Sequence, residues 1–535
     1  MSASVTRDSF AEQNLPPRAE WPDLIFTRPE LQYPARLNCV SAFLDRWVAE
    51  GHGAAPCLIS PTLRWSYAEL HAQVNRICHV LVGRLGMRPG HRVLLRSANN
   101  PMMVACYLAV LKAGGIVVAT MPMLRAGELS YPIEKARIAL ALCDARLAED
   151  LEAARPLAPT LQRIVYFNSS AADGLEALCA EAPAEFAAHD TAADEVCLIG
   201  FTSGTTGQPK GTMHFHRDLL AVCDAYGGNI LRPRPDDCFI GSPPLAFTFG
   251  LGGLVLFPLH VGAATVLLER AGPDDLLAAI PRFRPSICFT APTAYRAMLA
   301  KMAGSDLSSL RACVSAGEHL PRATFDAWLA ATGIKLMDGI GSTELLHIFI
   351  ATVPDEIRTG ATGKPVPGYE ARVVDETGRD VPDGTIGRLA VRGPTGCRYL
   401  ADPRQANYVQ DGWNITGDTF LRDADGYFWY QARSDDMIIS SGYNIAGPEV
   451  EAALLLHEAV QECAVIGVAD DDRGAVVKAF VVLRPGHEGD AAMTEALQNF
   501  VKAAIAPYKY PRAIAYCSEL PKTNTGKLQR FRLRQ

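Results

Sequence analysis

The fold of this chain is decided by residues 196–211, VCLIGFTSGTTGQPKG. The first part, Val196–Phe201, is a compact apolar run that predicts a buried strand. The part that follows is dense in glycine, serine and threonine and ends in a proline and a lysine. Glycines let backbone N–H groups approach a ligand closely, and a lysine adds positive charge, so this loop suits a polyphosphate. It does not fit the G-x-x-x-x-G-K-[ST] pattern of a Walker A loop. The predicted phosphate-binding residues are Thr202, Ser203, Gly204, Thr205, Thr206, Gly207 and Lys210.

Helical and strand patterns alternate on both sides of this loop. The predicted helices are Tyr67–Leu85 and Pro101–Ala113, and the predicted strands are Arg92–Leu95, Gly115–Thr120, Ser286–Thr290 and Ala312–Ser315. This alternation indicates an α/β sheet covered by helices. Residues 1–34 carry several prolines and are expected to form an extended arm on the surface.

The pattern of residues in the sequence changes from Tyr369 onward. Glu370–Asp375 and Thr385–Arg392 flank a turn-rich segment and predict antiparallel hairpins. From Glu449 the pattern favours a βαβ-like unit that begins with an amphipathic helix and continues with strands at Cys463–Val468 and Val476–Leu483. We therefore expect a large N-terminal domain over 1–433, with a β-rich subdomain over about 353–433. A small α+β domain over 434–535 would follow it.

Composition narrows the functional classes. The chain has 535 residues, of which 49% are hydrophobic, and a formal net charge of -7. Such a chain can bury large cores, and its charge gives no basic footprint for nucleic acid or for anionic lipid. No segment has the length or character of a signal peptide or a membrane span. The 14 cysteines are scattered and form no C-x-x-C pair. This is typical of buried thiols in a reducing compartment and predicts a cytoplasmic protein.

Four further motifs follow the glycine-rich loop in order. They are GIGSTE at 339–344, TGD at 416–418, RSDD at 433–436 and PKTNTGK at 521–527. On these motifs the chain resembles the superfamily of acyl-adenylate-forming enzymes, which contains acyl- and aryl-CoA ligases, luciferases and the adenylation domains of peptide synthetases. The resemblance covers nearly the whole chain. It implies an α/β N-terminal domain, a mobile C-terminal domain, and the substrates ATP and coenzyme A with Mg²⁺.

The resemblance also implies a role for each motif in joining a carboxylate to the α-phosphate of ATP. Two anions must meet in that reaction, so charge neutralisation is the first requirement. The glycine-rich loop would hold the β- and γ-phosphates, and Thr343 would donate to the α-phosphate. Glu344 would coordinate Mg²⁺, a hard cation that prefers carboxylate oxygen. Asp418 would accept the ribose hydroxyls. The positions implied around the adenine are Gly317, Glu318 and Asp338.

The C-terminal motifs carry the remaining roles that the resemblance implies. Lys527 would bridge carboxylate and phosphate oxygens as a cation. Asp435 would be the hinge about which the small domain turns between the two half-reactions. Arg433 would hold the ribose or a phosphate, and the pantetheine tunnel of coenzyme A would be lined by Ser441, Gly442 and Tyr443. The sequence departs from the family at Ala432, where glycine is usual, and at Ile439, where many relatives carry lysine.

The acid to be activated is indicated by two aromatic or His-bearing segments. The run PPLAFTFGLGGLVLFP at 243–258 suits a flat apolar pocket with Phe247 or Phe249 as a wall, although such runs also occur as plain core. Together with GIGSTELLHIFI at 339–350, it resembles benzoate and 2-aminobenzoate (anthranilate) CoA ligases. That likeness adds Gly341 and His347 to the pocket, with His347 as a polar partner for an ortho substituent. The N-terminal region is most similar to the 2-aminobenzoate branch.

The sequence therefore predicts a 2-aminobenzoate–CoA ligase, with benzoate–CoA ligase as the nearest alternative. Three other readings stay open at this point. The chain would be an adenylation enzyme that loads a separate carrier protein, a luciferase-like enzyme, or a nucleotide-binding protein with a degenerate site. The last is disfavoured because Thr343, Glu344, Asp418 and Lys527 are all present. Nothing in the sequence selects an oligomeric state.

Overall fold

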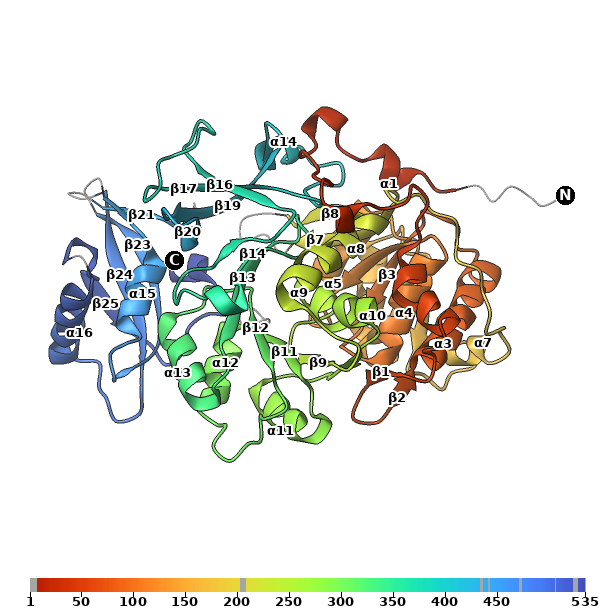
Figure 1. Ribbon diagram of the computed structural model, residues 1–535, viewed down its shortest axis with the longest axis horizontal. Coiled ribbons are helices and arrows are strands. Elements are labelled where there is room, and N and C mark those ends of the chain that lie inside the picture. Colours follow the sequence, from red (N-terminus) through yellow and green to blue (C-terminus); the bar gives the residue numbers. More distant parts are fainter. Residues whose placement is uncertain are drawn as a thin grey trace.

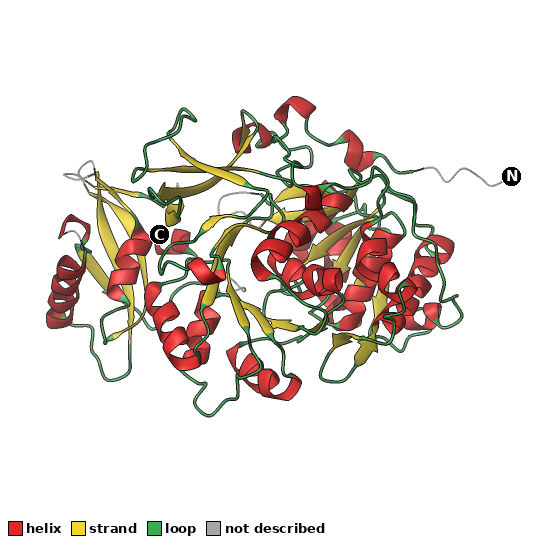
Figure 2. Ribbon diagram, in the orientation of Figure 1, coloured by secondary structure: helices red, strands yellow, loops and turns green. Residues whose placement is uncertain are grey.

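The computed structural model describes residues 7–202, 208–433, 436–440, 443–470, 474–505, 507–522 and 528–534. In these ranges the strands form sheets of nine, six, five, three and two strands. Helices pack around the two largest sheets, which occupy the centre of the molecule and the side that holds the N-terminus (Figures 1 and 2). The predicted α/β class, with a large N-terminal part and a smaller C-terminal one, is confirmed.

The six-stranded sheet contains the two strands that flank the glycine-rich segment. Its strands, in spatial order, are β6 (Arg163–Phe167), β5 (Leu140–Asp144), β3 (Arg92–Arg96), β4 (Ile116–Thr120), β7 (Val196–Thr202) and β8 (Lys210–Phe215). The first five are parallel, and β8 returns antiparallel to β7. The predicted loop therefore joins the two strands of a hairpin, which places it at the carboxyl end of a parallel strand. Ligands of open α/β sheets bind at such ends.

The nine-stranded sheet carries the second predicted motif. Its order is β15 (Lys364–Pro365), β14 (Ile348–Ala351), β13 (Leu336–Gly341), β12 (Ala312–Ser315), β11 (Ile287–Thr290), β9 (Cys238–Gly241), β10 (Ala264–Val266), β1 (Pro56–Ile59) and β2 (Arg64–Ser66). The central strands, from β13 to β1, are parallel, and both edges are antiparallel. Thr343 and Glu344 follow the carboxyl end of β13.

The remaining sheets lie toward the C-terminus. The five-stranded sheet is antiparallel and contains β16 (Glu370–Val374), β17 (Ile386–Arg392), β18 (Val409–Gln410), β19 (Trp413–Arg422) and β20 (Phe428–Arg433). The predicted hairpins in this region are confirmed. The two smaller sheets contain β21 (Ile438–Ser440) with β22 (Tyr443–Ile445), and β23 (Val460–Asp470), β24 (Gly474–Leu483) and β25 (Ala513–Tyr516).

Local sequence accounts for the main helices. Helix α3 begins after Ser66, whose hydroxyl accepts the N–H of Glu69 while the Glu69 carboxylate accepts the N–H of Ser66. This capping box satisfies donors that a helix start leaves unpaired. The helices are α1 (Phe10–Gln13), α2 (Arg46–Ala49), α3 (Tyr67–His79), α4 (Pro101–Lys112), α5 (Ala126–Lys135), α6 (Ala148–Ala154), α7 (Leu175–Cys179), α8 (His216–Val222), α9 (Thr248–Leu251), α10 (Phe257–Val261), α11 (Pro273–Phe283), α12 (Pro292–Leu299), α13 (Arg322–Thr332), α14 (Gln405–Tyr408), α15 (Gly447–Leu454), α16 (Ala491–Ala504) and α17 (Arg530–Leu533).

Two expectations from the sequence were wrong in detail. The predicted βαβ-like strands near 463–483 are β23 and β24, and they pair as an antiparallel hairpin; the parallel crossover is β24–α16–β25. A long hairpin explains this, since only residues 471–473 separate the two strands, too few for a crossover. The N-terminal arm is anchored rather than simply extended on the surface, because Trp21 and Leu31 are buried and the Trp21 and Phe215 ring centroids lie 5.6 Å apart.

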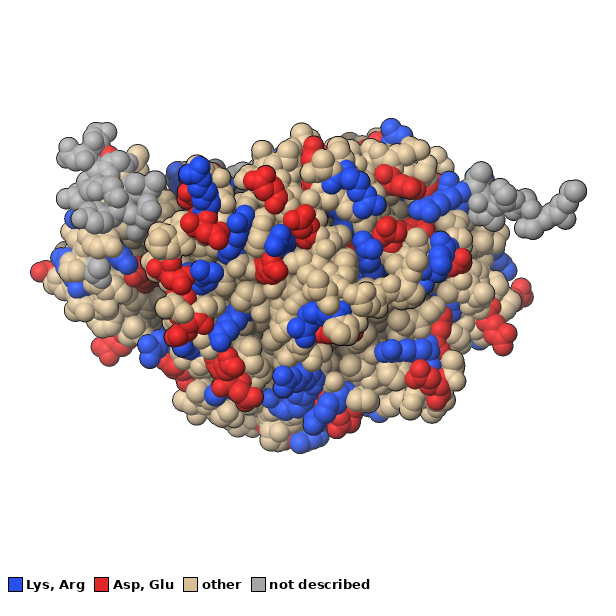
Figure 3. Space-filling model, turned by 45° about the horizontal axis from the view of Figure 1, so that its top comes forward, with Lys and Arg blue, Asp and Glu red and all other residues tan. Residues whose placement is uncertain are grey.

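Two further features of the molecule are the distribution of charge on its surface and the state of its cysteines. Lysine and arginine are interspersed with aspartate and glutamate on the face shown in Figure 3. All 14 cysteines are free thiols, and most are buried, as the sequence predicted. In the described part of the chain no helix combines the length and apolar character needed to cross a membrane.

Candidate active site

The hairpin of β7 and β8 is closed by the two ends of the predicted phosphate loop. Thr202 and Lys210 face each other across the strands, and the Lys210 N–H lies 3.4 Å from Oγ1 of Thr202. Residues 203–207, between them, lie outside the described part of the chain, so Ser203, Gly204, Thr205, Thr206 and Gly207 stay predictions. The structure places the two described ends of the loop next to the residues after β13.

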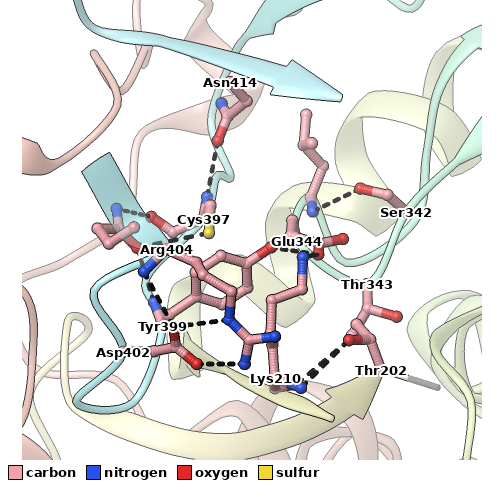
Figure 4. Close-up of polar contacts among 12 residues, drawn as sticks. Thr202, Lys210, Ser342, Thr343, Glu344, Cys397, Tyr399, Asp402, Arg404 and Asn414 are labelled. Carbon is pink, nitrogen blue, oxygen red and sulfur yellow. Dashed lines mark hydrogen bonds and ion pairs between the residues drawn. The ribbon is translucent and has the colours of Figure 1, made fainter. Parts of the chain in front are cut away.

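The Glu344 carboxylate is the centre of a buried polar cluster. The Tyr399 hydroxyl donates to Oε1 of Glu344 at 2.6 Å, and Nζ of Lys210 lies 3.8 Å from the same oxygen (Figure 4). The Lys210 ammonium also stands 4.8 Å from the ring centroid of Tyr399. One carboxylate, one phenol and one cation, from segments far apart in sequence, therefore meet beside the phosphate loop.

Thr343 is fixed from two sides. A Cβ placed on Gly200 of β7 would lie 2.9 Å from the Thr343 methyl group, so only glycine leaves room there. The Nε2 atom of His214, on β8, donates to the Thr343 carbonyl at 2.8 Å. Behind that ring, Asp218 is buried between His214 and Arg398, with which it forms an ion pair. Thr343 thus has a supported backbone at the point where the two large sheets meet.

Asp418 and Arg433 form a second polar pair, on the five-stranded sheet. They face each other across β19 and β20, and Nη1 of Arg433 donates to Oδ1 of Asp418 at 3.2 Å. Burial raises the pKa of Asp418, and the Arg433 guanidinium opposes that rise. A buried carboxylate with one fixed donor keeps acceptor capacity for hydroxyl groups. This arrangement suits the predicted contact with a ribose.

The three positions predicted around an adenine do not share one environment. Asp338, on β13, is buried, and this burial raises the pKa of its carboxyl to about 8. Its Oδ1 atom has no hydrogen-bond partner within the described ranges. Gly317 has a φ of +91°, in the region that favours glycine, and it is exposed. Glu318 follows it at an intermediate level of exposure.

The predicted aromatic pocket is a cluster of rings around His347. The His347 ring centroid lies 4.6 Å from that of Phe257, 5.5 Å from that of Tyr226 and 5.9 Å from that of Phe249. Both His347 nitrogens and the Tyr226 hydroxyl are buried and form no hydrogen bond of ordinary length and angle with the described residues, and the only polar group that acts on the His347 ring there is the Phe249 backbone. Burial lowers the pKa of His347 to about 3, so the ring is neutral near pH 7.

Glycines make room for this cluster. A Cβ on Gly252 would lie 2.3 Å from Cδ2 of His347, and one on Gly341 would lie 2.7 Å from the His347 carbonyl oxygen. Phe247 is half-buried at the start of α9, and Phe249 packs within the cluster. Of the four predicted aryl-pocket residues, Phe249, Gly341 and His347 therefore lie together, and Phe247 precedes Phe249 by two residues along the chain. Asp435, Ser441, Gly442 and Lys527 fall outside the described residues, and of Tyr443 only the backbone pairing with Ser440 is described.

Comparisons with known proteins show the family of this chain. The model of the AMP-binding enzyme family matches residues 45–399, and that of the AMP-binding enzyme C-terminal domain matches 449–527. The chain belongs to the AMP-binding enzyme family. It is 37% identical over 514 residues to a benzoate–CoA ligase of Thauera aromatica, covering 95% of this chain and 98% of that protein. The acyl-adenylate-forming resemblance is thereby confirmed.

Solved structures of AMP-binding enzymes resemble the whole chain. An anthranilate CoA ligase, AuaEII, in complex with anthranoyl-AMP has a TM-score of 0.90 and 36% identity, covering 95% of this chain and 98% of that one. A benzoate CoA ligase from Burkholderia xenovorans LB400 has a TM-score of 0.85 and 31% identity, covering 93% of this chain and 100% of that one.

The described residues of this AMP-binding enzyme fit a magnesium ion that is bound together with a nucleotide. The described residues contain no group of three or more His, Cys, Asp or Glu side chains able to hold a metal. Glu344 instead offers a single carboxylate next to the phosphate loop. Mg²⁺ is commonly held by one or two carboxylates plus the phosphates of a substrate and water. The donor set therefore fits Mg²⁺ bound with ATP.

Three residues of the site were missed by sequence reasoning. Tyr399 and Tyr226 sit in segments without chemical motifs, and only the fold brings them to Glu344 and His347. His214 did leave a signal. It follows Lys210 and Thr212 at alternate positions, and side chains two apart on a strand share a face. That alternation predicts that His214 and Lys210 point to the same side of β8.

Proposed function

We propose that this enzyme is a 2-aminobenzoate (anthranilate)–CoA ligase. In the first half-reaction a carboxylate oxygen of the acid attacks the α-phosphorus of ATP, and the bond to the bridging oxygen breaks as pyrophosphate leaves. In the second, the thiol of coenzyme A attacks the acyl carbon and AMP leaves. The benzoate and anthranilate ligases to which the chain is similar support an aryl acid as substrate.

The observation that carries the 2-amino assignment is the set of unpartnered polar atoms among the aromatic rings. Buried polar groups are normally hydrogen-bonded, and leaving one unpaired costs about 1–3 kcal/mol. His347 and Tyr226 lack such partners among the described residues. A bound acid with a polar substituent would supply them. Because burial holds the pKa of His347 near 3, the ring offers a neutral donor and acceptor, which suits an uncharged amino group better than a second carboxylate.

The nucleotide would be bound by the residues of the cluster around Glu344. Lys210 and the loop at 202–207 would contact the β- and γ-phosphates, and Thr343 would donate to the α-phosphate. When bound at Glu344, Mg²⁺ supplies charge neutralisation to the phosphates. Asp418 would accept the ribose hydroxyls, with Arg433 beside it. Gly317, Glu318 and Asp338 would surround the adenine.

The C-terminal part would supply the catalytic lysine and the thiol site. We propose domains at 1–433 and 434–535, with Asp435 as the hinge between them. Lys527 would stabilise charge as the acyl-adenylate forms, and Ser441, Gly442 and Tyr443 would line the path of coenzyme A. We also propose a cytoplasmic location, which the free, mostly buried thiols support.

Pyrophosphate release tests the proposal. The assay contains ATP and Mg²⁺ with benzoate, 2-aminobenzoate, salicylate, 4-hydroxybenzoate or a medium-chain fatty acid, each with and without coenzyme A. We expect 2-aminobenzoate to give the highest kcat/KM and sustained turnover to need coenzyme A. A preference for benzoate would keep the reaction and refute the 2-amino assignment. Adenylation that coenzyme A does not accelerate would replace coenzyme A with a carrier protein as acceptor.

A further inference from the structure

Glu344 has a partner that the adenylation chemistry does not require. Tyr399 is 1% exposed, and its hydroxyl donates to Oε1 of Glu344 at 2.6 Å. The Glu344 carboxylate is 7% exposed and receives no hydrogen bond from the described residues at its other oxygen, Oε2. The phenol therefore holds one oxygen of the carboxylate, as the close-up in Figure 4 shows for the two side chains. The second oxygen is left for another ligand.

The backbone around Tyr399 is itself fixed against β8. Tyr399 forms an isolated antiparallel bridge with Thr212. On either side of that bridge, the Met213 N–H donates to the Arg398 carbonyl and the Leu400 N–H to the Gly211 carbonyl, each at 2.8 Å. The backbone around Tyr399 is therefore bonded to the edge of β8, the strand that begins at Lys210. These bonds fix the Tyr399 backbone relative to β8.

The side chain of Tyr399 is held with equal care. The backbone N–H of Tyr399 also donates to Oε1 of Gln405 at 2.9 Å, which fixes the main chain next to the phenol. Burial and the Glu344 carboxylate raise the pKa of Tyr399, so the phenol keeps its proton and acts only as a donor toward Glu344. A donor that stays protonated holds the carboxylate in one orientation and leaves it negatively charged.

We propose that Tyr399 is a positioning residue for magnesium-bound ATP, which orients the Glu344 carboxylate so that Oε2 faces the metal. The proposal rests on the proposed adenylation reaction, because that reaction is what brings Mg²⁺·ATP to Glu344. Groups that hydrogen-bond to a metal ligand fix its orientation, and their removal typically lowers metal affinity or activity about 10- to 100-fold. The thioester step uses no triphosphate and is independent of this contact.

Tyr399→Phe is the variant that isolates the hydroxyl. It keeps the ring over which Lys210 lies and removes only the donor to Glu344. Tyr408→Phe is the matched control, because the two rings are neighbours at 5.6 Å and the bond to Glu344 comes from Tyr399 and not from Tyr408. Thermal unfolding of both variants shows whether either substitution disturbs the fold.

Three readouts separate positioning from a structural role. For Tyr399→Phe we expect about 10-fold or greater weakening of Mg²⁺·ATP binding by calorimetry without acid, and a similar fall in kcat/KM for ATP in pyrophosphate release. We expect the rate of thioester formation from supplied aryl-adenylate and coenzyme A to stay within about twofold of wild type, since no metal ligand is needed there. Tyr408→Phe should change none of the three.

Each outcome tests a different part of the proposal. Equal behaviour of the two Phe variants, or an equal loss in both half-reactions, would overturn the positioning role. In a Glu344→Gln background, Tyr399→Phe should have no further effect on Mg²⁺·ATP binding; an additive effect would also overturn it. If the wild type binds Mg²⁺·ATP but adenylates none of the aryl acids, the proposed function fails, while calorimetry on the variants still tests Tyr399.

Discussion

The nucleotide side and the aryl side of the site differ in how their polar groups are satisfied. Around Glu344, the carboxylate already has the Tyr399 phenol and the Lys210 ammonium beside it, and the Thr343 carbonyl accepts from His214. Around His347, both ring nitrogens are buried among aromatic rings and have no hydrogen-bond partner in the described parts of the chain. One side is paired by the protein itself, and the other is not.

This difference indicates where preorganisation ends and selection begins. Charges that are oriented before binding need no reorganisation during reaction, which is the main electrostatic source of catalysis. Polar groups left unpaired penalise any acid that cannot pair them, and that penalty discriminates between substrates. The nucleotide side should thus act on every acid equally, whereas the aryl side should distinguish among acids.

Glu344→Gln should have the largest effect and the least selectivity. The substitution keeps the shape but removes the charge beside the phosphate loop, so we expect a fall in kcat/KM of about 100-fold or more. The fall should be the same for 2-aminobenzoate and benzoate. Pyrophosphate release with each acid measures it. A loss confined to one acid would show that Glu344 contacts the acid and would break the contrast between the two sides.

His347→Phe should have a smaller and selective effect. Phenylalanine fills a similar volume but cannot hydrogen-bond, so an amino group placed against it loses its partner. We expect about a 10- to 100-fold fall in kcat/KM for 2-aminobenzoate, with benzoate changed by less than about threefold. Because burial lowers the pKa of His347 to about 3, wild-type preference should be constant from pH 6 to 9. Equal losses for both acids would assign His347 to packing alone.

Particular residues show how far sequence could lead. The strand before the phosphate loop and the hairpins after Tyr369 follow from local patterns, and the family resemblance gave Lys210 and Glu344 roles at the same phosphates, where the structure places them 3.8 Å apart. The βαβ-like unit was misplaced because an apolar run does not reveal whether its partner strand is parallel. Tyr399 and Tyr226 could not be predicted, because their roles depend on long-range contacts, such as the bridge between Tyr399 and Thr212.

Asp338 is the exception on the nucleotide side, and Asp338→Asn tests it. Burial raises the pKa of its carboxyl to about 8, against an ordinary value near 4 in the unfolded chain. The stability contributed by the protonated form is fully present below about pH 4 and is lost as the pH rises through 8. In that window the free energy of unfolding should fall by up to about 1.4 kcal/mol per pH unit.

The Asn variant removes this titration, so its stability should depend less on pH between 5 and 8. Urea unfolding at several pH values, for both proteins, measures the difference in slope. Parallel slopes would show that the carboxyl finds a partner that keeps it ionised. Asp338 would then belong with the paired groups around Glu344.

Tyr226→Phe should give the smallest effect and the finest resolution of the aryl side. Tyr226 lies beside His347 and is 1% exposed. Its hydroxyl has no hydrogen-bond partner in the described structure. If the bound acid pairs with it, its removal should lower kcat/KM for 2-aminobenzoate about threefold to tenfold. If no acid reaches it, its removal should leave activity unchanged and raise the melting temperature, because an unpaired buried hydroxyl is costly.

The double variant Tyr226→Phe with His347→Phe separates a shared contact from two independent ones. Contacts to the same amino group are coupled, so the loss of both should cost less than the product of the single losses. Benzoate is the matched control substrate, since it has no group for either side chain to bind. Multiplicative losses would place Tyr226 and His347 on different parts of the acid, and the contrast between the two sides would then rest on more than one recognition point.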